Sequence, residues 1–367
     1  MKNIFVGIDK SFFLIAVVLS AVGFFILASA SAALSEKQFG VPYYYIANQF
    51  MRGFIPGMIL FFIGLSVSYT AWRTYSVPFI IASLILMVMV FMPDVGFSYG
   101  GAMRWITIGP ITFQPSEILK LALIMYLASW LESRKSVIQE YSATFIPFII
   151  IVSIIGVFLV LQPDLGTFIV IGANALFMYL IGGSRWSQIG ALMVLGLVAF
   201  FIFLQFFSSP YGRDRMFTFL NPGHDPLGKG YQVNQAQIAI GSGGFFGRGI
   251  GESIQKYGLL PEPIGDSIFA VFAEEFGFVG AGALVLLFLF FLWRGLSIAT
   301  RAPNVFGKLL ATGIVVSISI QAFINIGANS GIVPLTGIPL PFISYGGTSL
   351  AMTMASVGIL LNVSKAA

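Results

Sequence analysis

Acidic side chains gather in one short stretch of this chain, LLPEPIGDSIFAVFAEEFG, which runs from Leu259 to Gly277. It holds Glu262, Asp266, Glu274 and Glu275, although only 9% of the whole chain is charged. Asp266 follows a turn-forming glycine and precedes an apolar run, so it either caps a helix N-terminus or serves as a general base at a membrane surface. Glu274 and Glu275 lie two turns or more farther along, where packing is their expected role and pairing with basic residues or cation binding is the alternative.

Three other ionisable groups interrupt apolar stretches, where charged side chains are costly and therefore indicate function. Glu117 and Lys120 are three residues apart on one face of a predicted helix, so they form an internal ion pair, line a cavity, or do both. Asp164, in LQPDLGTF, occupies a tight turn with Pro163 and Gly166. It either caps the next helix or lines a polar site, and these two interpretations are compatible.

A long polar segment, residues 208–265, precedes Asp266 and is much longer than an ordinary connection. Its basic side chains are Arg213, Arg215, Lys229, Arg248 and Lys256. Charged donors among glycine-rich turns suit a diphosphate, and anionic lipid headgroups are the alternative ligand. The motif GSGGFFGRGIG lacks the Gly-Lys-Ser/Thr ending of a phosphate-binding loop, so ATP-driven transport has no support.

The composition excludes several kinds of chemistry. The chain has no cysteine and one histidine, His224, which excludes thiolate catalysis and a metal site built from several histidines or cysteines. The net charge of +5 is spread over many loops, so we expect no nucleic-acid partner.

The elements that position these residues are predicted to be membrane helices. The chain is 57% hydrophobic, its mean hydropathy is +0.94, and its apolar runs are long and continuous. We expect an all-α integral membrane protein of about ten spanning helices, because each needs roughly 20 apolar residues. Residues 1–367 would form a single membrane domain, with 208–265 as a large extracytoplasmic loop between spans seven and eight. The predicted spans are 12–33, 54–72, 77–93, 117–132, 145–162, 165–182, 187–207, 267–294, 305–327 and 342–363.

Basic residues predict the orientation of this bundle, since cytoplasmic loops are enriched in lysine and arginine. One set of segments carries Lys2, Lys10, Arg73, Arg134, Lys135, Arg185, Arg294, Arg301, Lys308 and Lys365, whereas the short loops opposite carry only Lys37, Arg52 and Arg104. An even number of spans places both termini on the more basic side. We therefore expect both termini in the cytoplasm.

Two more segments have mixed character. Residues 94–116 include GGAMRWITIGPITFQPS, in which aromatic and apolar residues around Arg104 predict an interfacial segment lying on the membrane. The stretch PLPFISYGGTSL contains Ser344 and begins the last span. Its small residues 346–349 favour close helix packing.

Five motifs taken together resemble one family. FQPSEILKLA, LQPDLGT, GYQVNQAQIAIGSGGFFGRGIGESIQKYGLLPE, DSIFAVFAEEFG and PLPFISYGGTSL follow in order. They are similar to the shape, elongation, division and sporulation (SEDS) family, whose members include RodA and FtsW. The similarity extends from about Ser29 to Asn362. SASAALSEKQFGVPYYYIANQ and IQKYGLLPE are slightly closer to the FtsW-like division branch.

The resemblance implies a peptidoglycan glycosyltransferase of the bacterial cytoplasmic membrane that polymerises lipid II, a disaccharide-peptide on undecaprenyl diphosphate. The implied partners are a class B penicillin-binding protein and proteins of the divisome or elongasome. The family's essential acid falls on Asp266. Its further motif residues fall on Lys120, Asp164 and Glu262, and we add Arg104, Arg213, Arg215 and Ser344 as candidate substrate-binding residues.

One departure from the family pattern lies beside Asp266. The family commonly has His-Thr directly before its essential aspartate, and this chain has Ile264 and Gly265. Any role of that histidine or threonine in orienting substrate is absent or moved here, whereas the aspartate is retained.

The expected reaction is sugar transfer with inversion, in which Asp266 acts as general base and basic residues or a divalent cation, Mg²⁺ or Mn²⁺, neutralise the leaving diphosphate. Two other classes remain open. A lipid II flippase would need acids near the bilayer midplane. A scaffold that only recruits the penicillin-binding protein would leave Asp266 without a task.

Overall fold

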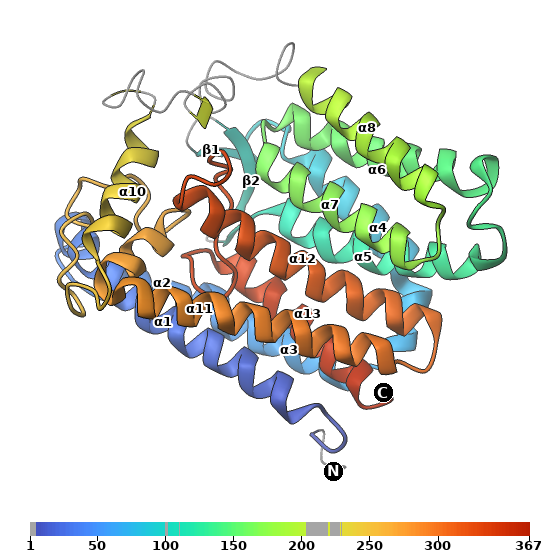
Figure 1. The fold of residues 1–367 in the computed structure, drawn as a ribbon, viewed down its shortest axis with the longest axis horizontal. Helices are drawn as coiled ribbons and strands as arrows, with labels where there is room; N and C mark the ends of the chain where they lie inside the picture. Colours follow the sequence, from blue (N-terminus) through green and yellow to red (C-terminus); the bar gives the residue numbers. More distant parts are fainter. Residues whose placement is uncertain (1–4, 100–101, 110, 203–218, 221–227, 229) are drawn as a thin grey trace.

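The protein is a bundle of long helices with one small sheet (Figure 1). The computed structural model describes residues 5–99, 102–109, 111–202, 219–220, 228 and 230–367. The helices are α1 (Lys10–Phe39), α2 (Tyr44–Gln49), the π-helix η1 (Phe50–Phe54), α3 (Ile55–Ser66), α4 (Tyr69–Met89), α5 (Pro115–Ser133), η2 (Lys135–Val137), the π-helix η3 (Tyr141–Phe145), α6 (Ile146–Leu161), α7 (Leu165–Ile181), α8 (Trp186–Ile202), α10 (Tyr231–Ser242), α11 (Ile268–Arg301), α12 (Val305–Asn329) and α13 (Gly347–Ser364). Both termini lie at one end of the bundle, and α11 begins at the opposite end, which we call the Asp266 end.

Each of the ten predicted spans overlaps one of these helices, which confirms a helical, multi-pass membrane protein. Within the described part of the chain, seven helical segments are long and apolar enough to cross a membrane. The helices α7 and α8 are apolar but shorter. The apolar sequence of α5 is interrupted by the charged residues Glu117, Lys120 and Glu132. The number ten itself therefore stays a prediction.

The two C-terminal helices form the centre of the bundle. In the apolar windows of α12 and α13, 83% and 89% of residues are buried, against 33% for α1. Small residues permit this packing, because α13 lies directly against the backbone of α3 and η1. A Cβ atom on Gly358 would lie 2.3 Å from the Phe61 carbonyl oxygen, and one on Gly347 would lie 2.8 Å from that of Arg52. Close packing through Gly347 is thus confirmed.

Three short strands of the segment 94–116 form an antiparallel sheet, which was not predicted. The position of this segment on the membrane surface stays a prediction. Its strands are β1 (Gly96–Tyr99), β2 (Ala102–Ile108) and β3 (Ile111–Phe113), in the order β1-β2-β3. Ile106 pairs with both Gly96 and Phe113. The β-branched and aromatic residues of β2 favour a strand, a signal that the overall hydropathy of the segment concealed.

The long helix α11 is broken at Gly277, whose φ of 64° and ψ of −164° lie outside the helical range. The segment 243–249 supplies the backbone partners there. The amides of Arg248 and Gly249 donate to the carbonyls of Glu274 and Glu275 at 3.0 and 3.1 Å. In return, the amide of Phe278 donates to the Gly244 carbonyl at 2.9 Å, and that of Val279 to the Phe245 carbonyl at 3.1 Å. The backbone groups released by the break are therefore satisfied within the protein.

An ion-pair cluster lies at the end of the bundle opposite the Asp266 end. Asp9 caps α1 by accepting from the Phe12 amide at 3.0 Å. It also pairs with Arg294 at 2.8 Å and Arg301 at 3.0 Å, both near the C-terminus of α11. Burial alone would raise the pKa of the Asp9 carboxyl, but the hydrogen bonds from Arg294, Phe12 and Arg301 together hold that pKa below its ordinary value.

Candidate functional site

Asp266 lies at the N-terminal end of α11, half-buried, and a side-chain amide from α10 holds its carboxylate. Nε2 of Gln232 donates to Asp266 Oδ1 at 3.1 Å and to Ser267 Oγ at 3.0 Å. The helix N-cap falls on Ser267 rather than on Asp266, so the capping interpretation of Asp266 was wrong by one residue. The carboxylate nevertheless lies at the positive end of the α11 dipole.

The backbone before α11 is fixed by three consecutive carbonyls. That of Ile264 accepts from the Tyr345 amide at 2.8 Å. That of Gly265 accepts from Ser344 Oγ at 2.7 Å. That of Asp266 accepts from the Nδ2 atoms of Asn325 and Asn329, each at 2.8 Å. The donors to these three carbonyls therefore belong to segment 338–346 and to α12.

Ser344 therefore fixes the backbone directly before Asp266. Its hydroxyl also accepts from the Leu340 amide at 2.7 Å, and its side chain is buried. Gln49, at the end of α2, binds the same segment: its side chain donates to the Ser344 carbonyl at 3.3 Å and accepts from the Gly346 amide at 2.9 Å. Whether Ser344 also contacts substrate stays a prediction.

Lys120 lies in a buried polar cluster between α5 and α12. Its Nζ donates to Glu117 Oε1 at 2.8 Å and to Gln321 Oε1 at 2.5 Å. The ion pair is confirmed, and both charged residues also line a small cavity of about 30 Å³ that reaches α13. Nε2 of Gln321 continues to the Pro339 carbonyl at 2.9 Å.

Three amide side chains on α12 connect this cluster to Asp266. Gln321, Asn325 and Asn329 follow at intervals of four residues, so they share one helix face. Asn325 donates to the Ile338 carbonyl as well as to that of Asp266, at 2.8 Å in both cases. Sequence reasoning missed all three, and it missed Gln232. Their signal was present as amides at helical spacing in QAFINIGAN, within an otherwise apolar span.

Asp164 caps α7, as predicted, by accepting from the Thr167 amide at 3.3 Å. Arg104, from β2, lies beside it: Nη1 is 3.9 Å from Asp164 Oδ1. The Arg104 guanidinium also donates to the carbonyls of Gln162, at 3.3 Å, and Pro163. The second oxygen, Asp164 Oδ2, is buried and has no hydrogen-bond partner within the described ranges. An acceptor thus remains available at this second polar cluster.

Glu262 lies on an exposed turn directly before Asp266. Its carbonyl accepts from the amides of Gly265 at 3.0 Å and Ser267 at 3.2 Å, which closes the turn. Its carboxylate Oε2 would lie 3.2 Å from a Cβ atom on Gly265, so Glu262 and Asp266 belong to one turn. Arg213 and Arg215 lie outside the described residues.

The two deeper acids organise the fold, as expected. Glu274 accepts from Ser253 Oγ at 2.5 Å and from the amide of Ile254 at 3.1 Å. Glu275 forms a buried ion pair of 2.8 Å with Lys256 and accepts from Ser29 Oγ. Packing and pairing with basic residues are confirmed for both.

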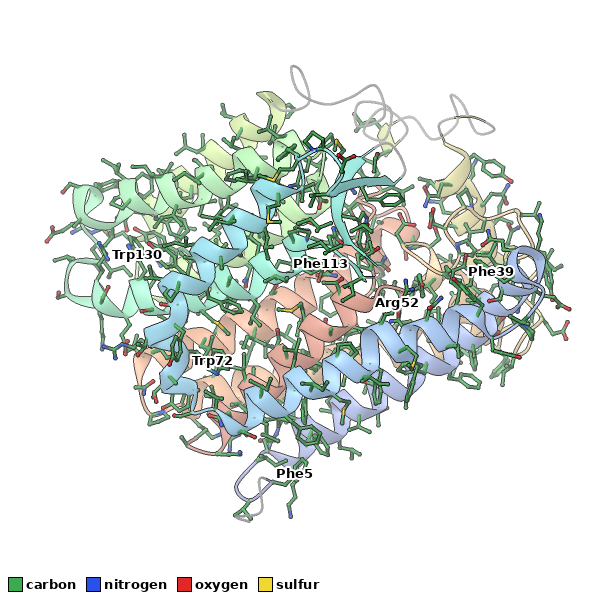
Figure 2. All side chains as sticks on the ribbon, turned by 180° about the vertical axis from the view of Figure 1, so that it is seen from behind. Phe5, Phe39, Arg52, Trp72, Phe113 and Trp130 are labelled. Carbon is green, nitrogen blue, oxygen red and sulfur yellow. The ribbon has the colours of Figure 1, made fainter. Side chains whose placement is uncertain are left out.

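Aromatic and basic side chains border the N-terminus of α13. Arg52 and Phe113 lie near the middle of the molecule in Figure 2, and Arg52 is exposed. The ring of Tyr345 lies 5.1 Å from that of Tyr45, edge to face. This border gives the Asp266 end polar and aromatic walls.

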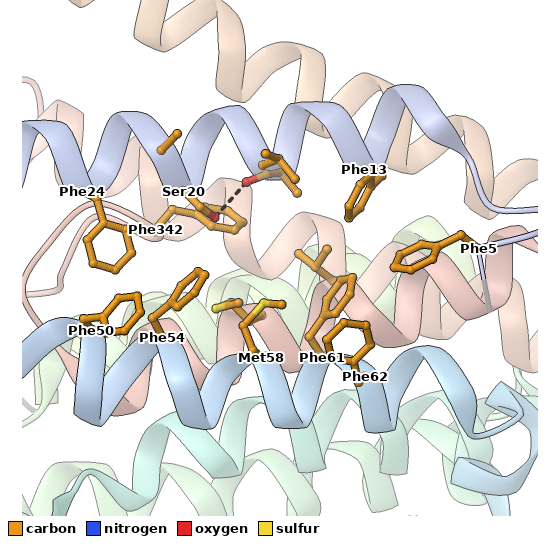
Figure 3. A pocket seen from close by; sticks show the side chains of 15 residues that line it. Phe5, Phe13, Ser20, Phe24, Phe50, Phe54, Met58, Phe61, Phe62 and Phe342 are labelled. Atoms are coloured by element: carbon orange, nitrogen blue, oxygen red, sulfur yellow. Dashed lines mark hydrogen bonds between the residues drawn. The ribbon is translucent and has the colours of Figure 1, made fainter. Parts of the chain in front are cut away.

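An apolar cavity of about 420 Å³ lies between α1 and α3 (Figure 3). Phenylalanines supply most of its wall, and Phe342 reaches it from the segment that holds Asp266 in place. The one hydroxyl in its lining, that of Ser20, is already bonded to the Ala16 carbonyl at 2.9 Å. The cavity therefore offers only apolar contacts. Phe342 in its wall is two residues before Ser344 in the sequence.

Among the described residues, no three acidic or histidine side chains converge to hold a metal ion. Oxygen ligands are what Mg²⁺ and Mn²⁺ prefer. The carboxylates of Asp266 and Glu262 share one turn and are of this type. Their donor atoms are therefore of the chemical type that such a cation binds, and the cation itself stays a prediction.

The fold and these polar clusters define a multi-pass membrane protein with a carboxylate held at one end of the bundle, and comparisons identify its family. The chain belongs to the SEDS family: a family model for FtsW, RodA and SpoVE, described as "Cell cycle protein", matches residues 9–367.

Relatives and solved structures agree with this membership. The chain is 40% identical to stage V sporulation protein E of Bacillus subtilis, over 97% of both chains. It is 38% identical to a probable peptidoglycan glycosyltransferase FtsW of Geobacter metallireducens, over 97% of this chain and 94% of the other. A structure described as "Structural coordination of polymerization and crosslinking by a peptidoglycan synthase complex" matches with a TM-score of 0.78, 29% identity and 98% coverage of both chains. A mutant of the rod shape determining protein RodA of Thermus thermophilus matches with a TM-score of 0.72, 26% identity and the same coverage.

Proposed function

We propose that this protein is a peptidoglycan glycosyltransferase that polymerises lipid II at the extracytoplasmic face of the bacterial cytoplasmic membrane, for cell division or elongation. The observation that carries the proposal is Asp266, a carboxylate held by Gln232 on one side and fixed through its backbone by Asn325 and Asn329. Such preorganisation is what a catalytic base requires. Names of relatives that include peptidoglycan glycosyltransferase support the reaction class.

The proposed step is an inverting glycosyl transfer. The 4-hydroxyl of the GlcNAc of one lipid II attacks C1 of the MurNAc that ends the growing chain. Asp266 takes the hydroxyl proton as the new C–O bond forms, and the bond from C1 to the diphosphate breaks with its electron pair on the diphosphate. General base catalysis of this kind contributes about 10²–10⁴-fold.

The leaving diphosphate requires positive charge. Arg213 and Arg215 are the proposed ligands from the long loop, with Lys120, Asp164 and Arg104 as polar contacts deeper in the bundle. A divalent cation, held by Asp266 and Glu262, would supply further charge neutralisation when bound. Lys120 and Arg104 are each engaged by protein acceptors, so their contribution requires these bonds to rearrange.

The apolar cavity between α1 and α3 is the proposed site for part of the undecaprenyl tail. It is lined by residues such as Phe24, Phe54 and Phe342 and opens along the bundle surface. If a polyprenyl chain entered the cavity from water, burial of its apolar surface would contribute roughly 25 cal/mol for each Å². In a bilayer, the cavity would instead contribute orientation of the tail beneath Asp266.

The proposed orientation places both termini in the cytoplasm and the Asp266 end outside. The structure with a TM-score of 0.78 is of a peptidoglycan synthase complex that coordinates polymerization and crosslinking. We extend that assembly to this chain and propose a class B penicillin-binding protein as its partner, together with divisome or elongasome proteins. Lipid II and undecaprenyl diphosphate are its proposed lipid ligands.

The test is polymerisation of labelled lipid II by purified protein with its cognate penicillin-binding protein and Mg²⁺ or Mn²⁺. Wild type should form long glycan strands, Asp266→Ala and Asp266→Asn should form none, and Glu252→Gln, at an exposed carboxylate of the same loop, should remain active. Equal polymer from the Asp266 variants would remove Asp266 as the base. Lipid II flipping in liposomes without polymer from any sample would instead establish a transporter.

A further inference from the structure

The segment 243–249 lies beside a spanning helix rather than above it. Four backbone hydrogen bonds join it to residues 274–279 of α11, between Arg248 and Glu274, Gly249 and Glu275, Phe278 and Gly244, and Val279 and Phe245. The first of these α11 residues is already six positions past Ile268, or about 9 Å along the axis at 1.5 Å per residue. The segment is therefore level with the helix interior and not with its end.

The helix α1 gives an independent measure of this depth. Its uncharged part runs from Ser11 to Ser35, and Ser29 lies six residues, about 9 Å, before the end of that part. Ser29 Oγ donates to the Glu275 carboxylate at 2.6 Å. Phe25, one turn deeper, has its ring 6.1 Å from that of Phe276. The break in α11 thus lies at the edge of the apolar layer.

Large apolar side chains are exposed at this level. Phe245 is 60% exposed, Phe246 80% and Phe278 68%. The rings of Phe245 and Phe278 stack at 5.7 Å, and those of Phe245 and Phe246 lie 5.0 Å apart. Val279 and Leu286, farther along α11, are exposed as well. The three phenylalanines therefore continue the bilayer-facing surface of a spanning helix.

We propose that Phe245, Phe246 and Phe278 form a membrane anchor, in which segment 243–249 inserts these side chains among phospholipid acyl chains of the leaflet at the Asp266 end. The inserted backbone has its partners within the protein, as a non-helical segment at this depth requires. Arg248 is the charged residue of the segment. Its side chain lies 3.6 Å from Glu274 and is 37% exposed, so its charge is matched at the apolar edge.

The anchor bears on the position of Gln232. α10 begins at Tyr231 and ends at Ser242, directly before the anchored segment. A fixed height of segment 243–249 in the leaflet therefore fixes the height of α10, and with it the amide that holds Asp266. The anchor itself does not depend on the proposed reaction.

Because the chain has no cysteine, single cysteines can report the depth of each position. Phe246→Cys and Phe278→Cys would carry a nitroxide in phospholipid nanodiscs, and collision rates with oxygen and with a water-soluble nickel chelate would be measured. Leu286→Cys is the lipid control on α11, and Lys37→Cys, eight residues beyond Ser29 on α1, is the aqueous control.

We expect the oxygen-to-nickel ratio at positions 246 and 278 to be several-fold above that at 37 and close to that at 286. A ratio at 246 equal to that at 37 would place the segment in water and overturn the anchor. Low collision rates with both reagents at 246 would show protein covering the patch, such as a second copy, and would also overturn it. Position 246 is mostly exposed, so its substitution leaves the fold intact and keeps the test independent of Phe278→Cys.

Discussion

Gln232 and Asp266 are joined by a hydrogen bond of 3.1 Å that ties α10 to the start of α11. The same amide nitrogen reaches Ser267 Oγ at 3.0 Å. This amide therefore donates both to the proposed base and to the N-cap residue of α11. A neutral amide that donates to a carboxylate orients it without competing for its charge.

Gln232→Ala should lower the turnover rate of lipid II polymerisation and leave KM unchanged, because Gln232 orients Asp266 and does not itself bind the sugar. A hydrogen bond to a charged group contributes about 1.5–3 kcal/mol, which corresponds to a decrease of about 10- to 160-fold. Gln237→Ala, on an exposed position of the same helix, is the matched control. Wild-type turnover in Gln232→Ala, or an equal loss in Gln237→Ala, would contradict a positioning role.

Asn325→Ala should destabilise the protein, because the buried Ile338 carbonyl loses a donor at 2.8 Å, whereas the Asp266 carbonyl keeps its hydrogen bond from Asn329. An unsatisfied buried polar group costs about 1–3 kcal/mol. The measurement is the midpoint of thermal unfolding in detergent. Ser319→Ala on the same helix is the control, because the Ser319 hydroxyl is buried without a hydrogen-bond partner in the described part of the chain. Equal midpoints for the two variants would show that the Asn325 bonds contribute nothing net.

The pairing of Asp9 with Arg294 and Arg301 predicts a pH dependence of stability. The folded protein holds the pKa of Asp9 below its ordinary value of 3.8, so the unfolded chain binds the proton more readily. The stabilisation is therefore fully present above that ordinary value and is lost as the pH falls through the lower pKa of the folded state. Wild type should unfold at a higher temperature than Asp9→Asn at pH 7, and this difference should shrink only below about pH 4. A difference that stays constant down to pH 2 would exclude this linkage.

The spans were predictable from the sequence because lipid imposes length and continuous apolarity on every spanning helix. Local signals also succeeded: the turn at Asp164 predicted a cap, and Glu117 and Lys120, three apart, predicted an ion pair. The sheet at 96–113 was missed, because the mixed hydropathy of that segment fits an interfacial piece as well as short strands.

The surroundings of Asp266 could not be predicted in the same way. Its partners Gln232, Asn325 and Asn329 are 34, 59 and 63 residues away in sequence, so only the folded bundle brings them together. Amides carry no charge and attract little notice in an apolar helix, even though burying one without partners is costly. The spacing of Gln321, Asn325 and Asn329 is the pattern that could have identified this face of α12.

Gly277→Ala should be strongly destabilising, because Gly277 has a backbone conformation that only glycine adopts readily and its Cβ atom would lie 2.3 Å from the Gly247 nitrogen. Straightening α11 to relieve this contact would break the four hydrogen bonds to segment 243–249. Gly282→Ala, five residues along the same helix and without neighbours within 4 Å of the new Cβ, should be neutral or stabilising by up to about 1 kcal/mol. Unfolding midpoints of both variants check the contrast, and hydrogen exchange of the Arg248 and Gly249 amides should increase in Gly277→Ala alone. Unchanged exchange at these amides, with wild-type stability, would mean that the break in α11 does not depend on a glycine.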